Sequence, residues 1–399
     1  MPPTTPTPAL DDDPFGDEIL TDPYPFHRQL RDAGPVVHLE RYGVWAMGRY
    51  EQVHAALIDH DTFCSGRGAG LADFHREKPW RPPSLLLEAD PPDHTAVRTA
   101  MSAVVSPRTV RRLRTGFAET AATIADKLAA RQEFDIVTDL AEVYPLQVFP
   151  DIVGLPKQGR ENLLPYGALA FNAFGPRNAR TEKALAEAAP VQRWIWDSCQ
   201  RHALAPDGLG ASIWAAADAG QITQEQAPML VRSLLSAGVD TTVHGIANTM
   251  HALTHHPEQW AALRDNPALA KFAFDEALRH SGPVQTFFRT TTRDVTIEDT
   301  TIPAGHKVLL FLGAANRDPR RWGTDADRFD ITRKAAGHVA FGMGIHQCIG
   351  QPIARLEVES VLTALTTRLS RLEPSAPPTP KLNNTLTGWA HIPVLGHRT

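Results

Sequence analysis

The sequence predicts a mainly α-helical fold with small β-sheets, and three observations support this prediction. Most of the 399-residue chain has the periodicity of helices. Twenty-seven glycines and 33 prolines divide that pattern into many short helices. Only two segments have the β-branched and apolar runs of paired strands, and no repeat of any length is present.

The two strand segments are short. Residues 36–40 and 43–47 flank a tight turn and predict a first strand pair. Residues 294–312 predict a second pair, with a Pro-Ala-Gly turn at residues 303–305.

The longest helical pattern runs from residue 223 to residue 256. Thr223 and Gln226 fit a capping box at its start, and Pro257 marks its end. Roughly 30 residues at about 1.5 Å each give a helix near 45 Å, long enough to cross the molecule. Asp240, Thr241 and Thr242 interrupt its apolar middle, where polar groups are costly unless they have partners.

The bulk composition is that of a globular protein. Hydrophobic residues are 42% and charged residues 21%, and the net charge of −5 argues against nucleic acid as a partner.

Three widely spaced cysteines do not form a disulfide framework and favour a reducing compartment. There is no signal-peptide pattern and no apolar run of about 18 residues, so we expect a soluble cytoplasmic protein without a membrane partner. We expect residues 1–14, Pro/Thr-rich and then acidic, to be a disordered tail, and residues 15–399 to form one domain.

The strongest chemical signal is the run FGMGIHQCIG at residues 341–350. A thiolate ligand needs a low dielectric, amide donors near sulfur and room for a large planar cofactor. The glycines allow a tight backbone loop, and a helix beginning after Gly350 would direct its positive end toward Cys348. A lone cysteine is more often a small buried hydrophobe. Zinc would need further ligands, and a dinucleotide loop would need its third glycine earlier.

This run resembles the signature of the cytochrome P450 family at every fixed position. The resemblance implies the cytochrome P450 fold, with many helices around a buried haem b, and Cys348 as the iron ligand in a loop that includes Gly342 and Gly350. It also implies a monooxygenase that inserts one oxygen atom from O2 into its substrate. Glu276 and Arg279 resemble the family's Glu-x-x-Arg pair, a buried pair that braces the cysteine loop, with Arg328 as a third member.

The same resemblance assigns further roles. The residues expected to hold the two haem propionates are His94, Arg98, Arg289 and His346. Residues 237–241 resemble the oxygen-activating segment of the central helix. There Thr241 would donate a hydrogen bond to dioxygen, and Asp240 would relay protons from solvent.

A narrower resemblance concerns bacterial monooxygenases that oxidise para-substituted benzoic acids such as 4-methoxybenzoate. It rests on residues 78–84, 166, 171–174, 232–236 and 284–289. It implies O-demethylation or hydroxylation of an aromatic acid. The polar groups expected to capture the carboxylate are Arg81, Ser84, Tyr166, Arg232 and Ser233. The residues expected to form the apolar slot are Leu87, Phe171, Phe174, Ala237, Val284 and Phe287. Trp389 stands where this subgroup has a smaller aliphatic, and it would narrow the slot or tilt the ring and so change the preferred para substituent.

Three alternatives stay open from the sequence: a monooxygenase for another small apolar substrate, a peroxide-using haem-thiolate enzyme, and a non-catalytic haem binder. The Asp240-Thr241 pair argues against peroxide use, and the lack of a second module argues against a sensor.

Because the chain has no flavin or nicotinamide motif, we expect electrons from a ferredoxin and an NADH-linked ferredoxin reductase. A basic cluster where an acidic ferredoxin could dock comprises Arg98, Arg108, Arg111, Arg112 and Arg114.

Overall fold

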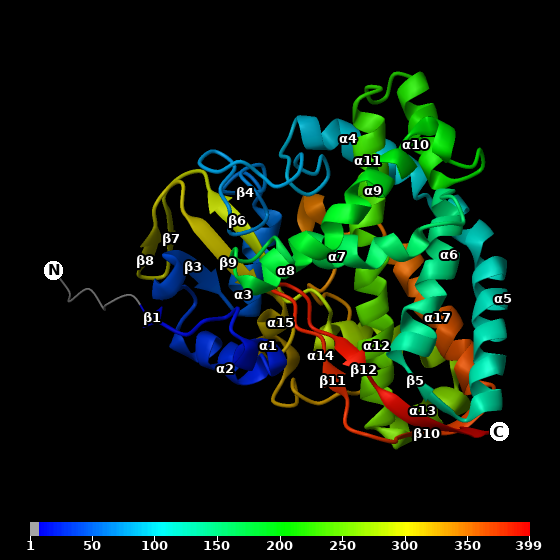
Figure 1. The fold of residues 1–399 in the computed structure, drawn as a ribbon. Helices are drawn as coiled ribbons and strands as arrows, with labels where there is room; N and C mark the ends of the chain where they lie inside the picture. The colour runs from blue at the N-terminus through cyan, green and yellow to red at the C-terminus, as the bar shows by residue number, and fades with distance from the viewer. Residues whose placement is uncertain (1–7) are drawn as a thin grey trace.

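A computed structural model describes residues 8–399 and shows a mainly helical protein, as predicted (Figure 1). The helices are α1 (Asp17–Thr21), α2 (Tyr24–Ala33), α3 (Tyr50–Ile58), α4 (Asp93–Val104), α5 (Pro107–Arg131), α6 (Val143–Val153), α7 (Leu163–Asn172), α8 (Ala179–Ala188), α9 (Gln192–Ser198), α10 (Leu209–Asp218), α11 (Gln226–Ala237), α12 (Asp240–Thr254), α13 (Pro257–Asp265), α14 (Ala270–Ser281), α15 (Leu312–Ala315), α16 (Pro319–Trp322) and α17 (Gln351–Thr366).

The strands are β1 (Ala9–Leu10), β2 (Val37–Leu39), β3 (Val44–Met47), β4 (Phe63–Cys64), β5 (Glu133–Asp135), β6 (Thr286–Thr291), β7 (Val295–Ile297), β8 (Thr300–Ile302), β9 (Lys307–Phe311), β10 (Leu369–Pro374), β11 (Thr379–Pro380), β12 (Trp389–His391) and β13 (Pro393–Arg398). The largest sheet has the order β1-β2-β3-β9-β6-β4. It lies in the half of the molecule that contains the N-terminus, while α5, α12 and α17 lie in the other half (Figure 1).

The first predicted strand pair is confirmed, because β2 and β3 pair antiparallel with Val37 opposite Ala46. The second prediction is wrong in its pairing. β7 and β8 pair with each other around a turn at Glu298, whose φ is 51°. β9 instead lies between β3 and β6 in the large sheet. All five residues of β9 are buried, so this strand gains most by lying in the centre of the sheet.

The predicted N-terminal tail is too long at its C-terminal end. Residues 1–7 of it lie outside the described residues. β1 pairs parallel with β2, with Ala9 opposite His38, and the His38 N–H donates to the Pro8 carbonyl at 2.8 Å. Residues 8–10 therefore form backbone hydrogen bonds with the edge of β2 that would otherwise be unpaired, and this pairing holds them in a fixed position.

The predicted central helix is broken into α11 and α12 at Gly238 and Val239. Its capping box is confirmed: the Thr223 N–H donates to Gln226 Oε1 at 2.9 Å, and the Gln226 N–H donates to Thr223 Oγ1 at 3.3 Å. At the break, the Thr241 hydroxyl donates to the Ala237 carbonyl at 2.7 Å, taking an acceptor that backbone N–H groups leave free. A Cβ on Gly238 would lie 2.0 Å from the Phe149 ring, so only glycine fits there.

The largest apolar core lies among the long helices. It includes Leu128 of α5, Ile246 of α12, Ala277 of α14 and Val361 of α17, all at most 2% exposed. α5 and α17 lie side by side along one edge of the molecule (Figure 1). Since α17 begins at Gln351, three residues after Cys348, this packing fixes the position of the cysteine loop.

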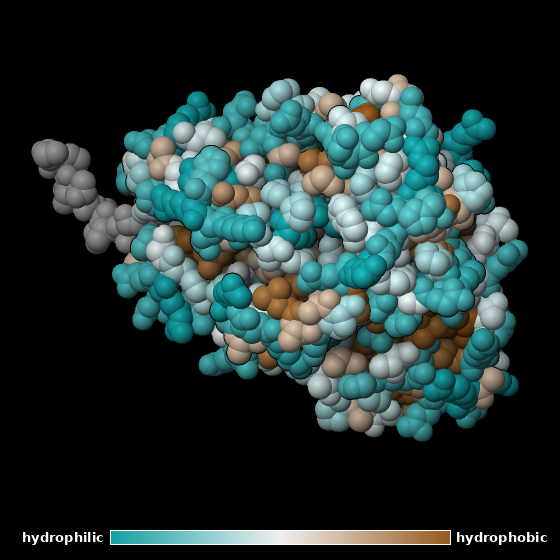
Figure 2. All heavy atoms as spheres, turned by 45° about the horizontal axis from the view of Figure 1, so that its top comes forward, coloured by the Kyte–Doolittle hydropathy of each residue, from teal (hydrophilic) through white to brown (hydrophobic). Residues whose placement is uncertain are grey.

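Hydrophilic residues dominate the face drawn in Figure 2, where apolar residues form small patches. Among residues 8–399, no helix combines the length and hydropathy needed to cross a membrane.

Candidate active site

The cysteine loop has the tight backbone that its glycines predict. Gly342 and Gly344 both have φ of 67°, a left-handed conformation that favours glycine. A Cβ on Gly344 would lie 2.7 Å from the Leu57 carbonyl oxygen, so α3 approaches the loop closely. The Cys348 N–H donates to the Phe341 carbonyl at 2.8 Å and closes the loop.

The Cys348 thiol is exposed to a cavity in the protein. Burial raises the pKa of this thiol, and the N–H groups of Gly350 and Gln351 and the charge of Arg98 act in the opposite direction. Both N–H groups lie at the start of α17, as expected for a helix whose positive end faces the sulfur. The described residues therefore provide the amide donors that a thiolate ligand needs.

The cavity brings together most of the residues singled out from the sequence. Besides Cys348, Gly342 and Gly350, its lining includes Arg81, Ser84, Leu87, Arg98, Phe171, Phe174, Arg232, Ser233, Ala237, Thr241, Val284, Phe287, Arg289 and His346. Four expected site residues are absent from the lining: His94, Tyr166, Asp240 and Trp389.

The four expected propionate ligands form a cluster of buried donors. The rings of His94 and His346 lie 4.5 Å apart, and the Nε2 atoms of both are buried without a hydrogen-bond partner. Arg289 is 3% exposed, its one side-chain hydrogen bond is to the Phe288 carbonyl, and burial lowers its pKa to about 10. Burial lowers the pKa of His94 to about 4, and Asp90 Oδ1 lies 3.9 Å from His346 Nε2. Buried polar groups with unused hydrogen-bonding capacity, such as these ring nitrogens and the Arg289 guanidinium, can be satisfied by the carboxylates of a ligand. Together with the thiol and the glycine loop, this cluster fits haem b and its two carboxylates.

A second polar cluster lies in the same cavity, on α11 and on the loop before α4. Arg81 Nη1 donates to Glu88 Oε2 at 3.1 Å, and its Nε is buried without a partner. Ser84 Oγ and Ser233 Oγ lie 3.4 Å apart. Arg232 Nη2 donates to the Pro82 carbonyl at 2.8 Å, and its pKa is lowered, chiefly by burial and then by the charge of Arg81. These two hydroxyls and two guanidinium groups line the cavity, and one of the guanidinium groups is paired with Glu88.

Tyr166 is not part of that lining. It is 3% exposed, and its ring lies 6.2 Å from the Trp80 ring in an edge-on arrangement. The Tyr166 phenol nevertheless lies near Arg232, whose pKa it acts to raise against the larger effect of burial.

The apolar walls of the cavity combine aliphatic residues with several phenylalanines. The Phe174 ring lies 5.8 Å from Phe171 and 5.3 Å from Phe287, both edge-to-face, which holds the three rings in fixed orientations. Val284 forms a backbone bridge to Leu386, and Leu386 packs in the same apolar cluster. A narrow slot of rigid rings accepts a flat apolar body.

Trp389 does not narrow this slot as predicted. It begins β12 and stacks on His251 of α12 at 4.1 Å between ring centroids. Its position follows from the pairing of β11 with β12, which directs the residue toward α12 instead of the cavity. Leu386, which the sequence pattern did not reveal, is the residue of this segment that packs against the slot.

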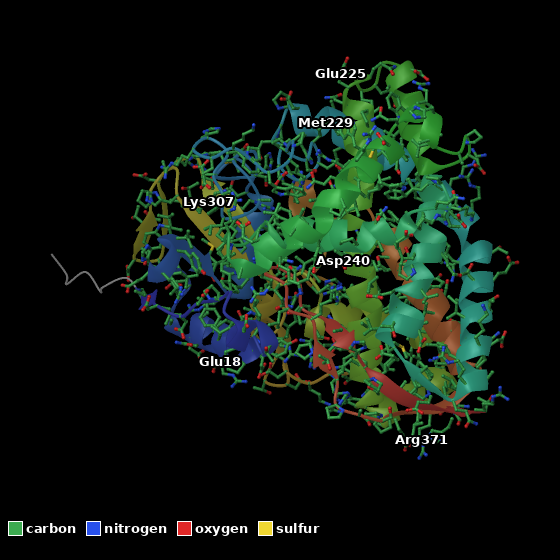
Figure 3. The ribbon with its side chains drawn as sticks, viewed as in Figure 1. Glu18, Glu225, Met229, Asp240, Lys307 and Arg371 are labelled. Atoms are coloured by element: carbon green, nitrogen blue, oxygen red, sulfur yellow. The ribbon has the colours of Figure 1, made fainter. Side chains whose placement is uncertain are left out.

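Thr241 and Asp240 face different surroundings. Thr241 lines the cavity, whereas Asp240 is 1% exposed and lies in the interior near α7 (Figure 3). Neither Asp240 oxygen has a hydrogen-bond partner, and His244 Nε2 lies 3.7 Å from Oδ1. Burial lowers the pKa of His244 to about 4, although the Asp240 charge acts in the opposite direction. The sequence does not reveal His244, one turn after Asp240, because a lone histidine in a helix carries no recognisable signal.

The Glu276–Arg279 pair is fully buried, with Arg279 Nε donating to Glu276 Oε2 at 2.7 Å. The third charged member is Arg333, at 3.3 Å from Glu276; Arg328, the predicted member, contributes only its backbone carbonyl. Arg279 also donates to the Asn316 carbonyl, and the Asn316 side chain accepts from the Val339 N–H at 2.8 Å. The pair is thereby linked to the segment that enters the cysteine loop.

Comparisons with known proteins agree with this site. Residues 207–393 match the family model described as Cytochrome P450. The chain is 54% identical over 401 residues to "Cytochrome p450 CYP199A2" of Rhodopseudomonas palustris, an alignment that covers 99% of this chain and 97% of that one. It is 34% identical to "Cytochrome P450 monooxygenase PikC" of Streptomyces venezuelae, covering 92% and 88% of the two chains.

Among solved structures, "cytochrome P450 CREJ in complex with (4-ethylphenyl) dihydrogen phosphate" is similar with a TM-score of 0.87 and 28% identity, covering 96% of this chain and 99% of that one. The fold, the glycine-framed thiol and these relatives lead to one conclusion. The chain belongs to the cytochrome P450 family and is a monooxygenase that binds haem b and depends on redox partners.

Proposed function

We propose that this monooxygenase oxidises an aromatic carboxylic acid with a small para substituent, and that it O-demethylates 4-methoxybenzoate. The observation that supports this proposal is the polar cluster of Arg81, Ser84, Arg232 and Ser233 beside three phenylalanine rings, in the cavity that also contains Cys348. A buried arginine with a free donor favours a carboxylate, and Arg81 Nε is such a donor. The flat slot beside them favours a benzene ring.

The chain's own residues position the substrate. Arg81 Nε and the two serine hydroxyls hold the carboxylate, while Phe171, Phe174 and Phe287 fix the plane of the ring. Haem b, when bound, supplies the activation of dioxygen that inserts one oxygen atom into the substrate. A hydroxylated methoxy carbon is an unstable hemiacetal, so it leaves as formaldehyde and gives 4-hydroxybenzoate.

Thr241 and Asp240 deliver protons for the activation of dioxygen. The Thr241 hydroxyl lines the cavity and donates to the Ala237 carbonyl, so it must leave this acceptor when it donates a hydrogen bond to dioxygen. The unpartnered Asp240 carboxylate accepts protons from the protein interior and returns to its charged state after each transfer. His244, at 3.7 Å, is the neighbour that can exchange a proton with it. His94, Arg98, Arg289 and His346 bind the haem propionates, and the rings of His94 and His346 lie 4.5 Å apart.

We propose a ferredoxin and an NADH-linked ferredoxin reductase as electron donors. Four arginines of the basic cluster are exposed at the start of α5, namely Arg108, Arg111, Arg112 and Arg114, while Arg98 lines the cavity instead. An acidic ferredoxin would be attracted to this surface, and the attraction would weaken with salt.

The three free cysteines fit a reducing compartment, so we place the enzyme in the cytoplasm. We also treat residues 15–399 as one domain.

The test is a titration of the ferric enzyme with 4-methoxybenzoate, its methyl ester and its meta isomer, followed by turnover with NADH and a ferredoxin system. We expect the acid to bind far more tightly than the ester, since the ester leaves the buried donors unpaired. We expect formaldehyde and 4-hydroxybenzoate in equal amounts from the acid. Equal binding of acid and ester would refute the carboxylate site but not the monooxygenase activity.

A further inference from the structure

Glu88 is a buried acid within the polar cluster that the sequence pattern does not single out. It is 7% exposed, and its Oε2 accepts hydrogen bonds from Arg81 at 3.1 Å and from the Ser84 N–H at 2.7 Å. Its own N–H donates to the Ser84 carbonyl at 2.8 Å, so residues 84–88 form a closed turn. This turn fixes the carboxylate beside one of the two guanidinium groups that we assign to the substrate.

The formal charge of this cluster can be counted. Arg81 and Arg232 each contribute one positive charge, and they lie near enough for the first to lower the pKa of the second. Glu88 contributes one negative charge, so the cluster carries a net charge of one plus. The other ionisable residues that line the cavity lie on the propionate side, in the cysteine loop or on α17: Arg98, Arg289, His346, Cys348 and Glu357.

We infer that Glu88 sets the charge preference of the substrate site, so that the site accepts monoanions such as carboxylates and rejects dianions such as aryl phosphonates or phosphates. This inference rests on the proposed aromatic-acid function. A monoanion brings the buried cluster to neutrality. A dianion leaves one uncompensated negative charge in a low-dielectric cavity, which is costly.

Two ligands of nearly equal shape and size but different charge test this preference. In 4-methoxybenzenesulfonate and 4-methoxyphenylphosphonate, a tetrahedral sulfur or phosphorus atom carries three oxygens. At a pH of about 8.5 the sulfonate is a monoanion and the phosphonate is a dianion. Their affinities for the holoenzyme are measured by calorimetry, which does not depend on turnover. We expect the wild type to favour the sulfonate, and Glu88→Gln to reduce the sulfonate-to-phosphonate preference by at least about tenfold.

Glutamine retains the acceptor for the Ser84 N–H, so the turn should persist in this variant. Arg232→Gln changes the charge in the other direction and should increase the preference for the sulfonate by at least about tenfold; it decides the question alone if Glu88→Gln does not fold. Glu182→Gln is the matched control, because Glu182 pairs with Arg177 on the exposed surface. It should leave the preference unchanged.

The outcomes distinguish the inference from the function on which it rests. If 4-methoxybenzoate binds but the preference stays within about twofold in both charge variants, Glu88 does not set the charge selectivity. If no anion binds the wild type better than neutral 4-methylanisole, the aromatic-acid function itself fails and the inference fails with it. Opposite shifts in the two charge variants support the inference, because a purely structural role would not reverse with the sign of the charge.

Discussion

Replacing Arg81 with alanine should abolish most of the affinity for 4-methoxybenzoate. In the structure, Arg81 Nε is buried without a partner and is free to bind the ligand, while Nη1 donates to Glu88 at 3.1 Å. Without Arg81, the cluster has one positive charge from Arg232 and one negative charge from Glu88. The incoming carboxylate would then be uncompensated.

The size of the effect follows from this change of charge. Truncating one partner of a buried, hydrogen-bonded charge pair costs about 2–5 kcal/mol, which corresponds to a loss of affinity of about 30-fold to several thousandfold. We expect a value in the upper half of this range, because Glu88 also loses its cation. The assay is a titration of the ferric haem spectrum with the acid, supported by calorimetry.

Two controls sharpen the test. Arg81→Lys keeps the charge but loses the planar fork, so its affinity should lie between those of the wild type and Arg81→Ala. Arg177→Ala removes an exposed arginine from a surface pair and should bind normally. An Arg81→Ala enzyme that bound 4-methoxybenzoate within about threefold of the wild type would refute the carboxylate site.

Four further outcomes are expected. Cys348→Ser should lose the red-shifted Soret band of the reduced carbon monoxide complex, and retention of that band would exclude Cys348 as the iron ligand. Thr241→Ala should consume NADH while releasing peroxide, and Asp240→Asn should slow turnover by about 10²–10⁴-fold; unchanged coupling and rates would contradict the proton roles. Leu386→Trp should weaken substrate binding whereas Trp389→Leu should not, since only Leu386 packs against the slot; the reverse result would contradict this placement. Glu276→Gln should lower the thermal midpoint and the haem content by leaving Arg279 and Arg333 without their buried anion, and a wild-type melting curve would argue against the brace.

Local rules account for the parts of the structure that the sequence predicts well. The capping box at Thr223 and Gln226, the left-handed glycines at 342 and 344, and the start of α17 after Gly350 depend only on neighbouring residues. Apart from the approach of Leu57 to Gly344, the contacts that hold these features are a few residues apart in the chain, so the sequence specifies them directly. The family signature rests on the same short-range pattern, which is why ten consecutive residues are enough to predict haem binding.

The predictions that are wrong all depend on contacts between distant segments. The local pattern assigns β9 to a hairpin, but its fully buried side chains place it between β3 and β6. The third partner of Glu276 is Arg333 instead of Arg328, because the backbone of residues 326–330 wraps around the pair and turns the Arg328 carbonyl toward it.

The sequence by itself determined the chemistry of this protein: a cysteine in a glycine-framed loop, a threonine in the central helix, and arginines and serines with the character of an acid-binding site. Tertiary structure decided which of those groups share one cavity. It turned Trp389 toward His251, placed Leu386 against the slot, buried Asp240 beside His244, and set Glu88 against Arg81. The physical reason is that packing and charge compensation act between side chains that are far apart in sequence, whereas a motif records only residues that are close together.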